Sequence, residues 1–241
     1  MKLFKKQIIE AHRGAKGLVK FENTIEAFAK AIEVGSDGIE LDVRKTKDNI
    51  IVVRHDADIK GNKICDLTKD ELDEITKKEG FICPTLEETI LYCKGKILLD
   101  IEVKEAGYEE EILKAILKHL SYDEFYIRSF IDKTVRKFKK LDKNVITILL
   151  IGRWKPKFGM ISRLPEIFPL FKILHSKCDM VSPYYKLLVW GYVKRMHFIG
   201  IPVIPWTVDG EENLRFVLLE KKVDGVVTNY PNIGIEVLNK K

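Results

Sequence analysis

The chain has 241 residues, of which 46% are hydrophobic and 32% charged, and its formal net charge is +6. This composition is typical of a folded protein and excludes an intrinsically disordered one. The positive excess is mild and is not gathered into Lys/Arg blocks or basic-aromatic stripes, so nucleic acid is not an expected partner. A solvated basic surface is the simplest interpretation, and attraction of an anionic substrate stays open.

Cysteine spacing and the N-terminal stretch bear on the compartment. The cysteines form no CxxC pair and no Cys/His ligand pattern, which indicates reduced thiols. They are Cys65, Cys83, Cys93 and Cys178. The first residues, MKLFKKQIIEAHRG, are too polar for the core of a signal peptide, and no run approaches a membrane-spanning length. We therefore expect a cytoplasmic protein without a transmembrane segment, and the sequence does not indicate its oligomeric state.

Short runs rich in Ile and Val alternate with amphipathic stretches along the chain. The expected strands are residues 8–12, 38–43, 50–55, 97–104, 125–130, 145–151, 179–184, 202–208 and 224–229. The expected helices are residues 24–35, 85–94, 108–120, 132–141, 186–200 and 211–222. This alternation predicts a parallel sheet with helical crossovers. No repeat or linker divides the chain, so we expect a single α/β domain over residues 1–241.

Nine strands are one more than a (β/α)₈ barrel requires. The connection from Val43 to Ile50 leaves room only for a turn, whereas a parallel crossover needs about a dozen residues or more. Residues 50–55 are therefore expected to fold back antiparallel as a hairpin, with Lys47-Asp48-Asn49 at its tip. Eight parallel strands remain, which predicts a closed TIM barrel.

The register of this hairpin decides where His55 points. A turn of even length, centred on residues 47–48, would pair Asp42 with Val53 and Glu40 with His55. Directly opposed residues point to the same face of a sheet, so His55 would then join the two acids. A loop of odd length or a bulge would turn His55 away. We take the even-length turn as the hypothesis.

Acidic side chains alternate along two expected strands, near the mouth where barrel enzymes keep their active sites. They are Glu40 and Asp42 in the second strand, and Asp100 and Glu102, followed by Lys104, in residues 97–104. Carboxylates that face one mouth repel one another unless a cation lies between them, and oxygen ligands favour Ca²⁺ or Mg²⁺ over Zn²⁺. The alternative is that each acid pairs with a Lys or Arg at the rim. For Glu40, Asp42 and Glu102 together, we favour one divalent cation.

Two histidines accompany these acids. An isolated histidine at a strand end is usually structural, but His12 and His55 beside carboxylates suit general acid and base catalysis near neutral pH. Arg13 and Lys104 would add two positive charges suited to a phosphate. The other histidines lie in helical or loop stretches and are interpreted as structural; they are His119, His175 and His197.

The stretch Glu22-Asn23-Thr24-Ile25-Glu26 predicts a helix start, with Asn23 as the N-cap and Glu26 at position N3. A second interpretation brings Glu22 to Arg13. Trp206 either packs in the core or lies at the rim, against the apolar side of a glycerol or alkyl group. Residues 152–175 are expected to form a rim lobe with a core-facing helix, and weak contact with a lipid surface is the minority interpretation.

Several segments, taken in order, resemble the glycerophosphodiester phosphodiesterase family. They are AHRG, FENTIEAFAKAIEVGSDGIELDVRKTKDNIIVVRHD, TLEE, DIEVK, PWTVD and DGVVTNYP. The resemblance runs from His12 to Pro231 and implies a TIM barrel that hydrolyses glycerophosphodiesters, such as glycerophosphocholine or glycerophosphoethanolamine, to glycerol 3-phosphate and an alcohol. A lysophospholipase D-type activity on single-chain lipids is the second interpretation, and a barrel that binds phosphodiesters without catalysis is the third.

The resemblance also implies roles for individual residues. It places His12 and His55 as the catalytic pair, Glu40, Asp42 and Glu102 as ligands of one Ca²⁺ or Mg²⁺, Arg13 and Lys104 at the phosphate, Trp206 against the substrate, and Glu22 and Asp56 in support. The chain departs from the family in a short insertion, about 56–84, which leaves the headgroup preference open. Arg128 stands where a small residue is more usual, and Asn229 where Asp is common.

Overall fold

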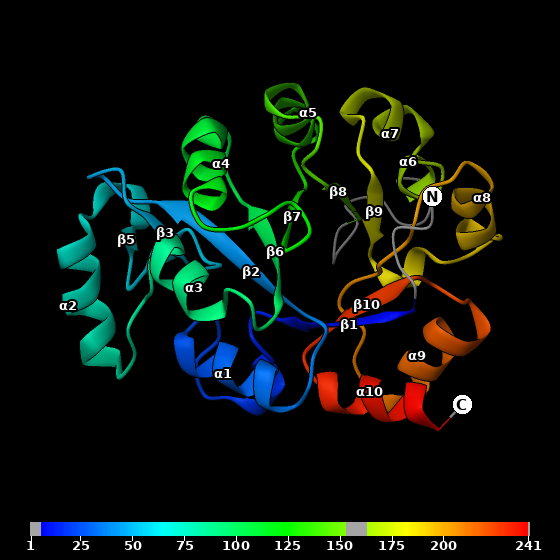
Figure 1. Ribbon diagram of the computed structural model, residues 1–241, viewed down its shortest axis with the longest axis horizontal. Helices are drawn as coiled ribbons and strands as arrows, with labels where there is room; N and C mark the ends of the chain where they lie inside the picture. The colour runs from blue at the N-terminus through cyan, green and yellow to red at the C-terminus, as the bar shows by residue number, and fades with distance from the viewer. Residues whose placement is uncertain (1–5, 153–162, 241) are drawn as a thin grey trace.

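In the computed structural model, which describes residues 6–152 and 163–240, parallel strands curl into a barrel surrounded by helices (Figure 1). Within these residues the main sheet has the strand order β10-β1-β2-β6-β7-β8-β9, and each ladder along this path is parallel. The strands are β1 (Ile8–His12), β2 (Gly38–Lys45), β6 (Leu98–Val103), β7 (Phe125–Ser129), β8 (Thr147–Ile151), β9 (Met180–Pro183) and β10 (Gly225–Thr228). The parallel barrel predicted from the sequence is thus confirmed.

Helices lie between consecutive strands and cover the outside of the sheet (Figure 1). They are α1 (Ile25–Glu33), α3 (Leu86–Cys93), α4 (Glu109–Leu117), α5 (Asp132–Leu141), α6 (Leu164–Ile167), α7 (Leu170–Ser176), α8 (Tyr192–Phe198), α9 (Glu211–Arg215) and α10 (Pro231–Asn239). The helix expected at residues 186–200 is shorter in the structure, where it corresponds to α8. The helix expected at residues 211–222 begins as α9 and continues as a π-helical turn, η5 (Phe216–Glu220). The expected rim lobe at 152–175 contains α6 and most of α7, and its residues 153–162 lie outside the described chain.

Residues 202–208 fill the remaining barrel position without forming a regular strand. On one side the N–H of Ile204 donates to the carbonyl of Val181 in β9, and on the other the N–H of Val227 in β10 donates to the carbonyl of Pro205, both at 3.0 Å. Proline has no N–H to donate, so the two prolines of this segment interrupt the ladder. The expected strand is therefore present as a closing segment held by isolated bridges.

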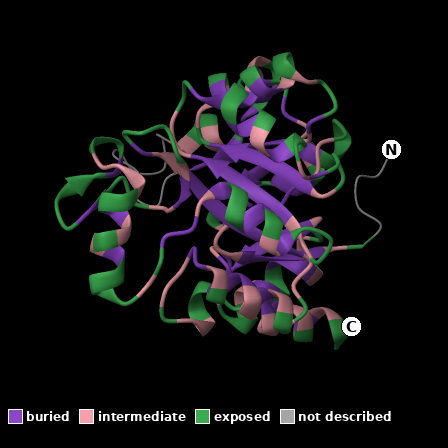
Figure 2. Cartoon of the chain, turned by 60° about the vertical axis from the view of Figure 1, so that its left-hand side comes forward, coloured by how far each residue is buried: buried purple, intermediate pink, exposed green. Residues whose placement is uncertain are grey.

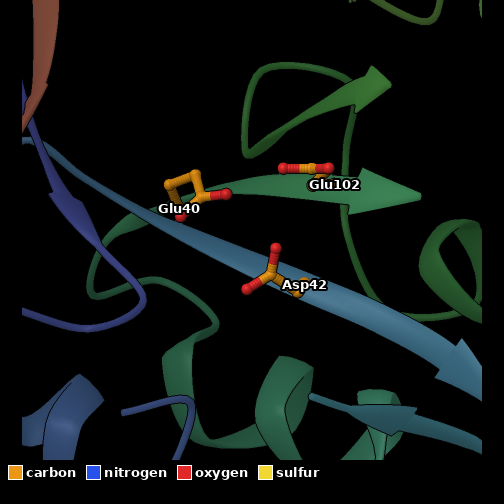
Figure 3. Close-up of side chains that lie close together, drawn as sticks. All are labelled: Glu40, Asp42 and Glu102. Atoms are coloured by element: carbon orange, nitrogen blue, oxygen red, sulfur yellow. The ribbon is translucent and has the colours of Figure 1, made fainter. Parts of the chain in front are cut away.

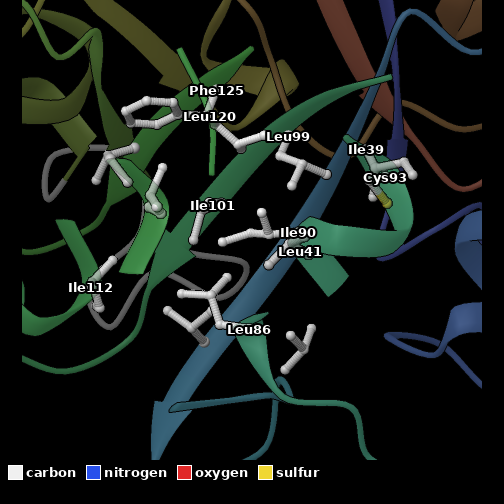
Figure 4. Close-up of a cluster of buried hydrophobic side chains, with 14 of the residues drawn as sticks. Ile39, Leu41, Leu86, Ile90, Cys93, Leu99, Ile101, Ile112, Leu120 and Phe125 are labelled. Carbon is white, nitrogen blue, oxygen red and sulfur yellow. The ribbon is translucent and has the colours of Figure 1, made fainter. Parts of the chain in front are cut away.

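The main apolar core lies between the sheet and its helices. Strand residues such as Ile39, Leu41 and Ile101 pack against Ile90 of α3 and Ile112 of α4, and all five are fully buried (Figure 4). Full burial of each such side chain contributes roughly 1.5–3 kcal/mol. The strands of the main sheet accordingly appear mostly buried, whereas the helices expose their outer faces (Figure 2).

The barrel interior is apolar at one end and charged toward the other. An apolar layer is formed by Ile8, Tyr126, Ile148, Met180, Ile204 and Val227. Above it, Arg128 of β7 donates a hydrogen bond to Glu10 of β1 at 2.8 Å and forms a second ion pair with Asp100 of β6. Because β2 and β6 lie between β1 and β7 in the sheet, the contact of Arg128 with Glu10 crosses the interior. Asp100 thus lies one layer below Glu102, away from the mouth.

The hairpin is present, but its expected register is wrong. β3 (Ile51–Val53) pairs antiparallel with β2, and Val43, not Asp42, lies opposite Val53. The reason is a three-residue tip, residues 47–49, in which Asn49 adopts a left-handed φ of 66°. Such odd-length loops with one left-handed residue are a common hairpin type, and they shift every partner by one position.

The expected start of the first helix is also wrong. Thr24 is the N-cap of α1, and its hydroxyl accepts a hydrogen bond from the N–H of Ala27 at 3.2 Å. Glu26 therefore falls at N2, where it cannot complete the expected capping box. Asn23 has a left-handed φ of 57°, and its side-chain amide donates to Asp42 Oδ2 at 2.8 Å instead.

The insertion after His55 forms a small lobe beside the barrel (Figure 1). It contains β4 (Asp58–Ile59), β5 (Asn62–Lys63), the 3₁₀ turn η2 (Ile64–Asp66) and α2 (Lys69–Glu79). The helix α2, which the sequence analysis missed, begins with a capping box between Thr68 and Glu71 and buries Leu72 against Ile64. The four cysteines are all free in the structure. No helix of the described chain is both long and apolar enough to cross a membrane.

The buried ion pairs of Arg128 with Glu10 and Asp100 are expected to stabilise the barrel, and mutation can test this. Arg128→Met would leave Glu10 and Asp100 without their counter-charge, and removal of one partner from a buried ion pair costs about 3–5 kcal/mol. We expect the free energy of unfolding, measured with urea, to fall by that amount. Glu10→Gln and Asp100→Asn, added to Arg128→Met, should recover part of the loss. An Arg128→Met protein as stable as the wild type would contradict this account.

Candidate functional site

Three carboxylates converge inside the barrel mouth (Figure 3). Glu40 and Asp42 come from β2 and Glu102 from β6, and the parallel register places Asp42 beside Glu102. All three side chains are buried, and one oxygen of each lies within 4.8 Å of the others. In the part of the chain that the structure describes, this is the one such group of acids, histidines or cysteines. The period-two alternation of strands explains how the three expected acids come together.

Lys104 lies closest to this acidic cluster. Its Nζ is 2.7 Å from Asp42 Oδ1 and 2.5 Å from Glu102 Oε1. Burial raises the pKa of Glu40 to about 8, and the charge of Asp42 acts in the same direction. Burial also opposes ionisation of Asp42, but Lys104 and Arg13 outweigh it and hold the pKa of Asp42 well below its usual range. The acids are therefore only partly neutralised by side chains.

This donor set fits a hard divalent cation. Ca²⁺ and Mg²⁺ prefer carboxylate oxygens, whereas zinc sites usually include nitrogen or sulfur ligands. Here all three donors are oxygens, and they are close enough to share one ion. Burial and the charge of Asp42 both raise the pKa of Glu40, and the attraction of a cation between the acids would oppose both effects. Glu40, Asp42 and Glu102 are the residues that would hold it.

Arg13 joins three acidic side chains. Its backbone N–H donates to Glu40 Oε2 at 3.1 Å, and its guanidinium Nε lies 3.4 Å from Asp42 Oδ2. The other end of the guanidinium donates to Glu22 Oε1 at 2.7 Å, so the contact expected between Glu22 and Arg13 is present. A left-handed φ of 51° at Arg13 turns the chain at the end of β1 and allows both backbone and side chain to face the mouth.

His12 lies at the end of β1 against the residue that follows β10. Its Nδ1 is 2.7 Å from Asn229 Oδ1, and its Nε2 is 3.9 Å from Glu40 Oε2. Burial lowers the pKa of His12 to about 3, and the nearby charge of Arg13 acts in the same direction. The ring is therefore neutral at physiological pH.

His55 reaches the mouth by a different route from the one expected. The shifted hairpin ends the β3 ladder at Val53, and the chain then leaves the sheet, with the His55 carbonyl held by Arg44 Nε at 2.8 Å. Its Nδ1 lies 2.7 Å from Asp56 Oδ1. Burial lowers the pKa of His55, while the charge of Asp42 opposes that shift. The expected grouping of the two histidines with the acids is thus present, although the expected reason for it was wrong.

A cavity of about 360 Å³ connects these groups. Its lining includes both histidines, the two expected phosphate-binding cations, Arg128 at its floor and Trp206 at its side. The indole N–H of Trp206 donates to the carbonyl of Ser182 at 2.9 Å, and its ring meets Phe130 edge-on at 5.4 Å between centroids. Trp206 therefore both packs on the barrel and presents an apolar wall to the cavity.

The residues that hold the site from behind were not predicted from the sequence. Asn23 binds Asp42, and Asn229 binds His12 and is itself bound by Asp209. The signal for two of them was present, since Asp209 directly follows the expected strand 202–208 and Asn229 is the last residue of the expected strand 224–229. No local pattern signals a polar partner on another strand, and Asn23 looked like an ordinary helix cap.

Comparisons with known proteins show which family this chain is similar to. Residues 12–233 match the family model described as the glycerophosphoryl diester phosphodiesterase family. A glycerophosphodiester phosphodiesterase from Caldanaerobacter subterraneus subsp. tengcongensis is 30% identical over 98% of this chain and 99% of the relative.

Solved structures give the same result for the fold. The crystal structure of a glycerophosphodiester phosphodiesterase from Thermotoga maritima superposes with a TM-score of 0.77 at 27% identity, over 98% of this chain and 99% of the other. An Oleispira antarctica phosphodiesterase, 20% identical over 97% of each chain, has the same fold with a TM-score of 0.81. The match over nearly the whole chain, together with the identity to a named relative, shows that this protein belongs to the glycerophosphoryl diester phosphodiesterase family.

Proposed function

We propose that the protein hydrolyses glycerophosphodiesters to sn-glycerol 3-phosphate and an alcohol, with a divalent cation and two histidines. The observation that carries the proposal is the joint placement of three buried acids, two histidines and two cations around one cavity, in a member of this family. The Oleispira antarctica relative was solved in complex with the product sn-glycerol-3-phosphate, which supports the same product here. We propose that the whole chain acts as one catalytic domain, with the 56–84 lobe at its side.

Binding of the phosphodiester rests on charge. Arg13 and Lys104 line the cavity, and their cationic groups would stabilise the negative charge that grows on the phosphoryl oxygens in the transition state. When bound at Glu40, Asp42 and Glu102, a Ca²⁺ or Mg²⁺ would polarise a phosphoryl oxygen and lower the pKa of an attacking hydroxyl. Trp206 would pack on the apolar side of the glycerol.

Proton transfer is assigned to the two histidines. The attacking oxygen, from the neighbouring glycerol hydroxyl or from water, forms a bond to phosphorus and gives its proton to one ring. The bond from phosphorus to the alcohol oxygen breaks, and the other ring protonates that oxygen so that a neutral alcohol leaves. If the glycerol hydroxyl attacks, the resulting cyclic phosphate is opened by water with the two rings in exchanged roles.

The histidine assignment predicts a large loss of turnover with an intact fold. His12→Ala and His55→Ala should each lower kcat for glycerophosphocholine by on the order of 10²- to 10⁴-fold, the usual contribution of a general acid or base. His197→Ala is the control, because His197 is exposed and contacts Asp224, which precedes β10 at the far end of the barrel. Unchanged turnover in either active-site variant, measured by coupled detection of glycerol 3-phosphate, would refute the assignment.

The metal assignment predicts dependence on a divalent cation. Exhaustive chelation with EDTA should abolish turnover, and Ca²⁺ or Mg²⁺ should restore it. Glu102→Gln removes one of three charged ligands, so more metal should be required for half-maximal activity. Full turnover after chelation would remove the cation from the mechanism.

The choice of substrate has its own test. A glycerophosphodiesterase should turn over glycerophosphocholine and glycerophosphoethanolamine faster than lysophosphatidylcholine. A preference for the lysolipid would replace the proposal with lysophospholipase D-type activity. Binding of all these ligands without turnover would indicate a non-catalytic barrel.

A further inference from the structure

Asn229 holds His12 through an amide whose orientation is itself fixed. β1 and β10 are neighbours, with Ala11 beside Thr228, so the residues that follow this pair emerge side by side at the mouth. Asn229 Oδ1 lies 2.7 Å from His12 Nδ1, and Asn229 Nδ2 donates to Asp209 Oδ2 at 2.6 Å. A carboxylate only accepts hydrogen bonds, so the NH₂ of the amide must face Asp209 and its oxygen must face His12.

Asp209 is in turn fixed by two further donors. The backbone N–H of Asn229 donates to Asp209 Oδ1 at 2.9 Å, and the hydroxyl of Thr228 donates to the same oxygen at 3.2 Å. Three donors from two consecutive residues therefore meet one carboxylate. An asparagine at position 209 would offer one oxygen to these donors, and its own NH₂ would face another donor.

We infer that Asn229 and Asp209 are positioning residues that hold the proton of the neutral His12 ring on Nδ1 and leave the lone pair of Nε2 open to the cavity. The inference rests on the proposed function for its kinetic meaning. Asn229 Oδ1 can only accept, so Nδ1 of His12 must carry the hydrogen. Nε2, which faces Glu40 beyond hydrogen-bond distance, is then the atom that accepts a proton from the attacking hydroxyl.

The second histidine has a different kind of partner. Nδ1 of His55 lies against the carboxylate of Asp56, whose negative charge would stabilise an imidazolium formed there and opposes the lowering of the His55 pKa by burial, whereas the amide of Asn229 carries no charge to do so for His12. The geometry therefore makes His12 the base and His55 the acid in the first proton transfer. Each ring is oriented through Nδ1 and presents Nε2 for the chemistry.

The tautomer can be observed directly, without an activity assay. We would label histidine with ¹⁵N in the Mg²⁺-loaded protein and record two-bond ¹H–¹⁵N correlations, with His12→Gln to assign the His12 signals. The wild type should show the hydrogen on Nδ1. Asp209→Asn forces a donor against a donor, and a flipped Asn229 would push the hydrogen to Nε2, so we expect a mixture of tautomers and a kcat lower by about 10- to 100-fold with little change in KM.

An exchange of the two side chains supplies the matched rescue. In Asn229→Asp combined with Asp209→Asn, the new asparagine can accept from the Thr228 hydroxyl and the backbone N–H and donate to the new aspartate, which accepts from His12. Every donor then meets an acceptor again, so both the Nδ1 tautomer and most of the lost kcat should return, although each single change impairs the enzyme.

Asp179→Asn controls for a purely structural effect. Asp179 accepts from the N–H and hydroxyl of Thr147, at 2.8 and 3.0 Å, just before β9 at the other end of the barrel. This change should lower the melting temperature and leave kcat and the His12 tautomer unaltered. A wild-type ring with its hydrogen on Nε2 would overturn the inference, as would an Asp209→Asn protein with the wild-type tautomer and kcat. Absence of turnover in the wild type would instead refute the proposed function, and the tautomer result would stand separately.

Discussion

The barrel interior concentrates more negative than positive charge, and the site depends on this imbalance. Five carboxylates of the described chain share this interior with three cationic side chains. Four of the acids form ion pairs with them, and the fifth, Glu40, accepts from the backbone N–H of Arg13. The acids are Glu10, Glu40, Asp42, Asp100 and Glu102, and the bases are Arg13, Lys104 and Arg128. With every group ionised, the deficit equals the charge of one divalent cation. Arg128 pairs with the lower two acids and leaves one negative charge unmatched there. Arg13 and Lys104 leave a second unmatched charge among the three acids at the mouth, where the proposed metal and phosphate would meet.

Strand periodicity made the acid cluster predictable. Alternation places Glu40 and Asp42 on one face, and a parallel neighbour with the same alternation brings Glu102 beside them. The barrel itself followed from the order of strands and helices and from one connection too short for a crossover. These features depend on patterns that extend over several residues, and such patterns can be recognised in a single sequence.

Features that depend on one backbone conformation could not be predicted in this way. The left-handed conformation of Asn49 gives the hairpin loop an odd number of residues, and that of Asn23 moves the helix cap to Thr24. Nothing in either local sequence decides between the two conformations. The partners of His12 are also hidden from local analysis, because Asn229 and Asp209 lie about two hundred residues further along the chain and meet it only once the barrel closes.

The segment that closes the barrel, residues 202–208, also positions part of the candidate site. Residues 202–208 hold their neighbours with an interrupted ladder, and Trp206 and Asp209 lie within or just after that stretch. Local opening of the chain costs the least free energy where backbone hydrogen bonds are few. Local opening of residues 202–208 would displace Trp206 together with Asp209, which orients His12 through Asn229. The acid cluster on β2 and β6 would stay in place. Metal retention and proton transfer could thus fail at different temperatures in the same molecule.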